Sequence, residues 1–134
     1  MKSLIHLTPH HVGCLTDNIE RSIASYGQIG FQKISEIISI SAQGVRVCFV
    51  ELRRDFFLEL VEFPETDEAL KKVFKSGNTY YHMGYLVKDA EAAAVTLVKQ
   101  DYQIINRFYS EAFQGRLCIF LYSPEMHLIE LIEE

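Results

Sequence analysis

Two histidine–glutamate pairs recur at one spacing along this 134-residue chain. Glu59 follows His11 by 48 positions (59 − 11), and Glu130 follows His82 by the same 48 (130 − 82). The second pair lies 71 positions after the first without a gap, as expected for a duplicated module that places equivalent residues symmetrically. Imidazole nitrogens and carboxylate oxygens both bind divalent metal ions. The spacing therefore predicts that these four side chains converge on one metal ion.

The same offset aligns other short segments of the chain. These are residues 11–13 (HVG) with 82–84 (HMG), Gln43-Gly44 with Gln114-Gly115, Phe49 with Phe120, and residues 58–60 (LEL) with 129–131 (IEL). We expect a single domain over residues 1–134, in which module 1 (about 7–63), a linker (64–79) and module 2 (about 80–134) share one core.

Hydrophobic patterning predicts the same order of elements in both modules, and hence an α+β protein with eight strands and two main helices. Strands are expected at residues 7–16, 32–41, 44–52, 56–63, 82–87, 102–108, 117–122 and 127–132. One helix is expected after Asp17 as N-cap, with Glu20 completing a capping box. A second helix, 90–100, follows Asp89 as N-cap. Its packing side is expected to be Ala90, Ala93, Ala94, Leu97 and Val98. The linker is expected to hold a short helix with Leu70, Val73 and Phe74.

Composition excludes several classes of protein. With 49% hydrophobic residues, 23% charged residues and a net charge of −5, the chain is typical of a soluble globular domain. Its 13 Lys and Arg residues are scattered, which argues against nucleic acid but leaves phosphate-bearing small ligands open. No signal peptide or membrane segment is recognisable, so we expect a cytoplasmic protein without a membrane partner. Three cysteines without CxxC spacing predict buried thiols rather than disulfides or a zinc site.

The strand positions of the four residues leave two interpretations open. Glu59 lies between Leu58 and Leu60, so a carboxylate buried there would need a compensating partner. The alternative is a strand whose charged face meets water, and a lone strand histidine is more often a hydrogen-bonded structural residue. Because both types recur together at one offset, metal binding is the favoured interpretation.

These segments resemble the vicinal oxygen chelate superfamily, which includes glyoxalase I, methylmalonyl-CoA epimerase, extradiol dioxygenases and bleomycin-resistance proteins. The resemblance covers nearly the whole chain, and residues 44–52 (GVRVCFVEL) and 57–62 (FLELVE) are most similar to the epimerase branch. It implies two βαβββ modules that form a U-shaped mixed sheet around a metal cleft, and it implies a homodimer. It also implies one divalent ion (Co, Ni, Zn, Mn or Fe). The four ligand positions fall on His11, Glu59, His82 and Glu130.

The resemblance implies an isomerase or epimerase that abstracts a proton next to a carbonyl or thioester, through an enediolate. A small molecule such as an acyl-CoA thioester would be the substrate, and Glu130 would be both ligand and base. Val47 stands where some epimerases carry a second glutamate. Glu51, on the same strand face, is the nearest substitute, although a solvated strand-end residue explains it equally well.

Two alternative functions remain. A glyoxalase I-like lactoylglutathione lyase shares the ligand set and the IELIE ending at residues 129–133. A non-enzymatic, drug-resistance type binding protein typically lacks the full ligand set. Extradiol dioxygenases use only one carboxylate, which disfavours them.

Three other segments carry local expectations. The polar turn at 123–127 is shorter than the glycine-rich segment that epimerases have between their last two strands. Phe113 and Gln114 are expected on a loop that covers the cleft, and Glu133-Glu134 is expected to be a solvated tail.

Overall fold

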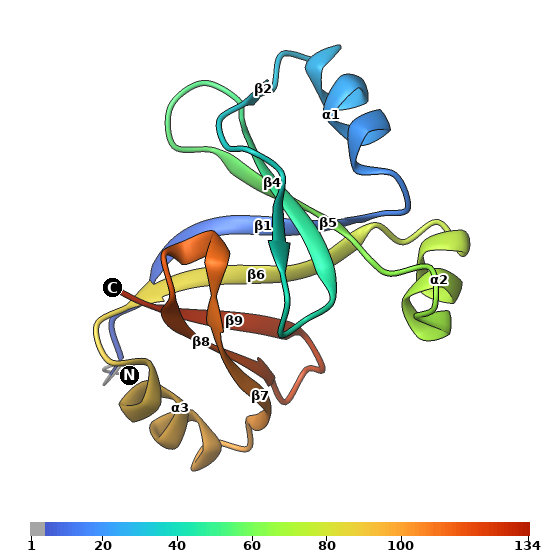
Figure 1. Ribbon diagram of the computed structural model, residues 1–134. Coiled ribbons are helices and arrows are strands. Elements are labelled where there is room, and N and C mark those ends of the chain that lie inside the picture. The colour runs from blue at the N-terminus through green and yellow to red at the C-terminus, as the bar shows by residue number, and fades with distance from the viewer. Residues whose placement is uncertain (1–4) are drawn as a thin grey trace. The chain divides into compact units, whose positions relative to one another are not determined.

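The computed structural model describes residues 5–134, which have a mixed α+β fold (Figure 1). The first half contains β1 (Thr8–Thr16), α1 (Ile19–Gly27), β2 (Gln32–Lys33), β3 (Ile38–Ile40), β4 (Val45–Glu51) and β5 (Phe57–Glu62). After α2 (Glu68–Lys75) come β6 (Tyr80–Val87), α3 (Ala90–Val98), β7 (Gln103–Ser110), a 3-10 turn (Glu111–Phe113), β8 (Arg116–Tyr122) and β9 (Leu128–Glu133). The predicted fold class is confirmed. None of the helices in residues 5–134 has the length and apolar character needed to span a bilayer.

The chain forms two compact units. Residues 11–81 make the first unit, and residues 82–134 together with the residues up to His10 make the second unit. The chain therefore passes from one unit to the other twice, at His10–His11 and at Tyr81–His82.

In the first unit the strand order is β2-β4-β5-β1. Strands β4 and β5 form an antiparallel hairpin, β5 runs parallel to β1, and both β2 and β3 pair antiparallel with β4. Helix α1 contacts β4 and β5. Its Ile19 is fully buried in a core that also contains Cys14, Phe31, Cys48, Val50, Leu58 and Leu60.

In the second unit the order is β6-β9-β8-β7, again with one parallel pair (β6 with β9) followed by antiparallel pairs. The predicted stripe on α3 is confirmed for its four buried members Ala90, Ala93, Ala94 and Leu97. It is wrong for Val98, which is 45% exposed. At about 100° per residue, Val98 falls at the edge of that stripe, in the last turn of the helix.

The predicted strand 32–41 is interrupted, which gives nine strands in residues 5–134 instead of the expected eight. Strand β2 ends at Lys33 and β3 begins at Ile38. Between them, Ser35 Oγ accepts a hydrogen bond from Phe49 N at 2.9 Å. A side chain thus takes the place of a backbone partner, and the ladder with β4 breaks.

The predicted N-cap of α1 is wrong by one residue. Asn18 Oδ1 accepts from Arg21 N at 2.9 Å, and Thr16 Oγ1 accepts from Asn18 N at 3.0 Å. Asp17 instead pairs with the Arg21 guanidinium, so the Asp17–Glu20 capping box does not form. The predicted cap Asp89 is confirmed on α3. It lies 71 positions after Asn18, so the repeat identifies the correct cap.

Candidate metal centre

The first His–Glu pair lies on two parallel strands of the first unit. Gly13 of β1 is paired with Glu59 of β5, and His11 precedes Gly13 by two residues, so His11 and Glu59 share one face. His11 Nε2 lies 3.4 Å from Glu59 Oε1. The two side chains are 0% and 4% exposed.

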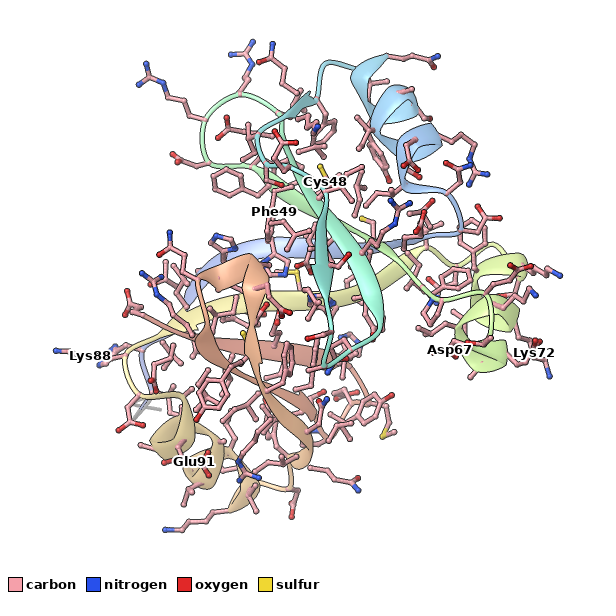
Figure 2. The ribbon with its side chains drawn as sticks, in the orientation of Figure 1. Cys48, Phe49, Asp67, Lys72, Lys88 and Glu91 are labelled. Carbon is pink, nitrogen blue, oxygen red and sulfur yellow. The ribbon has the colours of Figure 1, made fainter. Side chains whose placement is uncertain are left out.

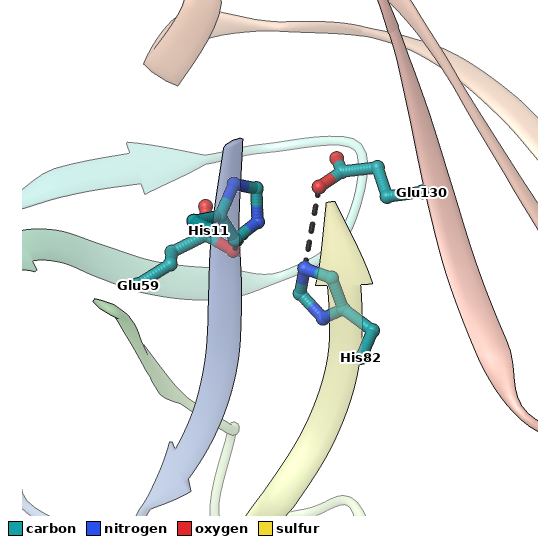
Figure 3. A group of neighbouring side chains, drawn as sticks. All are labelled: His11, Glu59, His82 and Glu130. Carbon is teal, nitrogen blue, oxygen red and sulfur yellow. Dashed lines mark ion pairs between the residues drawn. The ribbon is translucent and has the colours of Figure 1, made fainter. Parts of the chain in front are cut away.

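The second pair repeats this arrangement in the second unit. Gly84 of β6 is paired with Glu130 of β9, which places His82 and Glu130 on one face. His82 Nε2 lies 3.2 Å from Glu130 Oε1 (Figure 3), and the side chains are 1% and 4% exposed. The spacing of 48 positions therefore corresponds to a direct contact in each unit.

A phenylalanine packs against each of these histidines. The ring of Phe49 meets that of His11 edge-on at 5.6 Å between centroids, and the ring of Phe120 meets that of His82 edge-on at 5.2 Å. Each phenylalanine also lies directly across a strand pair from the glutamate of its own unit. The aromatic edges restrict rotation of the imidazoles. Offset 71 aligns Phe49 with Phe120, which is the signal from which this shared position could have been inferred.

Burial decides between the two interpretations of the glutamates. Glu59 and Glu130 are each 3% exposed, so the interpretation in which they face water is wrong. An isolated carboxylate at such a depth is costly unless a cation or hydrogen-bond donor compensates it. An imidazole lies against each carboxylate. A bound metal ion would compensate such a charge.

Glu51 and Val47 flank Phe49 on β4, and alternation places all three on the face of Glu59. Cys48 faces the opposite side, where it belongs to the core under α1 (Figure 2). Val47 is buried, whereas Glu51 is half-buried at the strand end. From a rise of about 3.4 Å per residue and a strand spacing of about 4.8 Å, the Cα of Glu51 lies about 8 Å from that of Glu59.

Two further glutamates fix the helices, and the sequence patterns did not predict this role for either of them. Glu62 Oε2 accepts a hydrogen bond from Ile19 N at 2.9 Å, and Glu133 Oε1 accepts one from Ala90 N at 3.1 Å. The expectation of a solvated Glu133 is therefore wrong. Arg46 holds Glu62 with an Nε–Oε1 distance of 2.7 Å, and this hydrogen bond lowers the pKa of the Glu62 carboxyl. Glu62 and Glu133 are 71 positions apart, so the repeat again contained the signal.

The cysteines are core residues, as predicted. All three are free and buried, and burial raises the pKa of the Cys14 and Cys48 thiols, which disfavours a nucleophilic thiolate. Phe113 ends the short 3-10 turn and is buried, and its ring contacts that of His10 edge-on at 5.5 Å.

Residues 10–120 match the Glyoxalase/Bleomycin resistance protein/Dioxygenase superfamily. No curated protein sequence matches the chain. Among solved structures, a hypothetical protein from Bacillus halodurans C-125 has 23% identity and a TM-score of 0.78, with 98% of this chain and 96% of that chain covered. The methylmalonyl-CoA epimerase from Mycobacterium tuberculosis has 21% identity and a TM-score of 0.79, with 99% and 92% covered. A variant of the Streptomyces coelicolor methylmalonyl-CoA epimerase, in complex with 2-nitronate-propionyl-CoA, has 21% identity and a TM-score of 0.77, with 96% and 99% covered. The chain therefore belongs to the Glyoxalase/Bleomycin resistance protein/Dioxygenase superfamily.

Proposed function

We propose that the protein is a divalent-metal-dependent enzyme that removes a proton next to the carbonyl of a thioester, as a methylmalonyl-CoA epimerase does. The observation that carries this proposal is the buried His–Glu contact that occurs at the equivalent place in each unit. Membership of the superfamily supports it, as does the likeness of the fold to structures named methylmalonyl-CoA epimerases, one of them in complex with methylmalonyl-CoA.

The proposed metal ligands are His11, Glu59, His82 and Glu130. All four are buried and are of types that hold metal ions. Two imidazoles and two carboxylates form a mixed nitrogen and oxygen set whose charge of about −2 neutralises a divalent ion, which suits Co, Ni, Zn, Mn or Fe. The donor set therefore fits a first-row divalent metal.

The path of the backbone supports the idea that the two pairs serve one ion. The chain crosses between the units at His10–His11 and at Tyr81–His82, so a proposed ligand stands at each crossing. Within the first unit, Leu15 N donates to Thr79 O at 2.7 Å, which brings the segment leading to the second crossing beside β1.

A bound divalent ion would stabilise the negative charge that develops on the substrate oxygen as the neighbouring proton leaves. We assign Glu130 as the base that takes this proton. Its carboxylate is shielded from water, and the nearby His82 and Phe120 restrict its orientation. Epimerisation also needs a proton donor on the opposite face of the substrate carbon, and we assign this role to Glu51.

Solvent deuterium exchange tests the proposal. Protein purified without chelator is analysed for bound metal and is then incubated in D2O with methylmalonyl-CoA, or with the hemithioacetal of methylglyoxal and glutathione. We expect about one divalent ion per chain and metal-dependent exchange into methylmalonyl-CoA. Exchange into the hemithioacetal alone would show that the activity is that of a glyoxalase I-like lyase and not that of an epimerase. Absence of both metal and exchange, even after addition of Co, Ni, Zn or Mn, would indicate a binding protein.

A further inference from the structure

The turn between β4 and β5 can be followed in Figure 1. It contains two adjacent arginines that line an open pocket. Leu52 N donates to Phe56 O at 3.0 Å and closes this turn. The pocket has a volume of about 750 Å³ and is lined by Gly30, Gln32, Glu51, Leu52, Arg53 and Arg54. A pocket of this size accommodates a small organic ligand.

The guanidinium groups of Arg53 and Arg54 are available to a ligand. Both residues are exposed, and neither makes an ion pair or a side-chain hydrogen bond within residues 5–134. Arg46 and Arg107, by contrast, are each held by glutamates. The pocket lining carries two positive charges and one negative charge, in a chain whose net charge is −5. Two neighbouring guanidinium groups are well suited to bind phosphate oxygens through paired hydrogen bonds.

The backbone of the turn is strained at Arg53. Its φ is +56°, and Asp55 has a φ of +71°. Asp tolerates this left-handed region better than Arg, and Gly adopts it without steric cost. Strain of this kind concentrates at sites that bind ligands. The presence of Arg rather than Gly at position 53 is therefore an independent indication that its side chain is used.

Two residues that line the pocket lie on the face of the sheet that carries the His11–Glu59 pair. Gln32 and Glu51 are paired across β2 and β4 and both line the pocket. Glu51 shares the face of Glu59. An extended ligand with its reacting end at Glu59 can therefore run along β4 toward Arg53.

We propose that Arg53 and Arg54 bind the phosphate groups at the nucleotide end of an acyl-CoA thioester. The identity of this ligand rests on the proposed function, whereas the anion site rests on the turn itself. A thioester that lacks the nucleotide would react at the same metal ligands without reaching the turn.

Calorimetric titration of the intact protein with CoA and with adenosine 3′,5′-bisphosphate tests the site. We expect Arg53→Gln/Arg54→Gln to weaken binding of both probes by about tenfold or more, because two charge-assisted contacts are lost. Arg116→Gln, which removes another exposed arginine, is the matched control and should bind as the wild type does. Arg53→Gly separates binding from folding, since it should weaken binding while the melting temperature stays the same or rises.

Equal affinity of the double variant and the wild type for CoA would overturn the site. An equal loss of affinity in Arg116→Gln would also overturn it, because general charge would then explain the effect. Failure of the proposed function has a different signature: no deuterium exchange into any thioester, with binding of adenosine 3′,5′-bisphosphate that still depends on Arg53 and Arg54. That result would keep the anion site and change only its ligand.

Discussion

Glu133 accepts a hydrogen bond at 3.1 Å from the backbone N–H of Ala90, the first residue of α3. The first N–H groups of a helix have no partner within the helix, and a carboxylate there also meets the positive end of the helix dipole. Glu133 follows the proposed ligand Glu130 by three residues on the same strand. The contact therefore fixes the end of the strand that carries this ligand.

Loss of this contact should destabilise the protein. We expect Glu133→Ala to lower the free energy of unfolding by about 1 kcal/mol, a typical value for loss of a helix cap. Urea denaturation measures the change. Glu134→Ala is the control, because Glu134 uses its backbone N–H to bind Val87 O and its side chain is exposed. Equal effects of the two substitutions would contradict the assignment.

The equivalent contact of Glu62 should make stability depend on pH. The hydrogen bond from Arg46 lowers the pKa of Glu62 below its ordinary value of 4.5. A lowered pKa contributes stability that is fully present above 4.5 and is lost as the pH falls through the lowered value. We expect Glu62→Gln to cost about 1 kcal/mol at pH 7, a modest value because the Arg46 side chain is 39% exposed and screened by water.

The difference in unfolding free energy between the wild type and Glu62→Gln should therefore shrink from pH 7 to pH 3. Denaturation at a series of pH values measures it. Glu65→Gln, an exposed neighbour, serves as the control. A difference that stays constant over this range would show that the charge of Glu62 is not involved.

The sequence predicted the positions that the repeat determines. Offset 71 located both His–Glu pairs, because a duplicated fold preserves which residues face each other across paired strands. The alternation of strands correctly placed Glu51 on the face of Val47, and the pairing of Phe49 with Glu59 shows that this is also the face of Glu59.

The remaining features depend on side chains that local pattern does not describe. The break after Lys33 arises because the Ser35 hydroxyl replaces a backbone partner. The cap by Glu133 joins residues 43 positions apart. Contacts over such distances are set by tertiary packing, which periodicity cannot reveal, although comparison of the two halves identifies Glu62 and Glu133 as equivalents.

Neutralisation of the proposed base should abolish turnover. Glu130→Gln keeps the shape of the side chain but removes its ability to take a proton, so we expect a loss of at least about a hundredfold in kcat. Proton exchange into methylmalonyl-CoA measures it, and bound metal is determined on the same sample. Glu125→Gln, an exposed residue in the preceding turn, is the control. Full activity of Glu130→Gln would exclude the role of base.

Glu51 should exchange a proton with only one of the two epimers of the substrate. If it serves the face opposite Glu130, Glu51→Gln should stop epimerisation, while solvent deuterium still enters the epimer whose proton Glu130 removes. NMR of each epimer in D2O distinguishes these steps. Glu36→Gln, at another exposed glutamate, provides the comparison. Unchanged epimerisation would show that Glu51 is only a strand-end residue.

The interleaved order of the two units has a consequence for synthesis on the ribosome. Residues 11–81 are contiguous, so the first unit can fold as soon as it emerges. The second unit has to wait, because Ile5 and Leu7 pack against a core formed by residues between Val87 and Leu131. At about 5–20 residues per second, translation of the 53 residues from His82 to Glu134 takes about 3–10 s. During that interval the nascent chain carries an apolar N-terminal segment without its partner, which is a time window for chaperone binding.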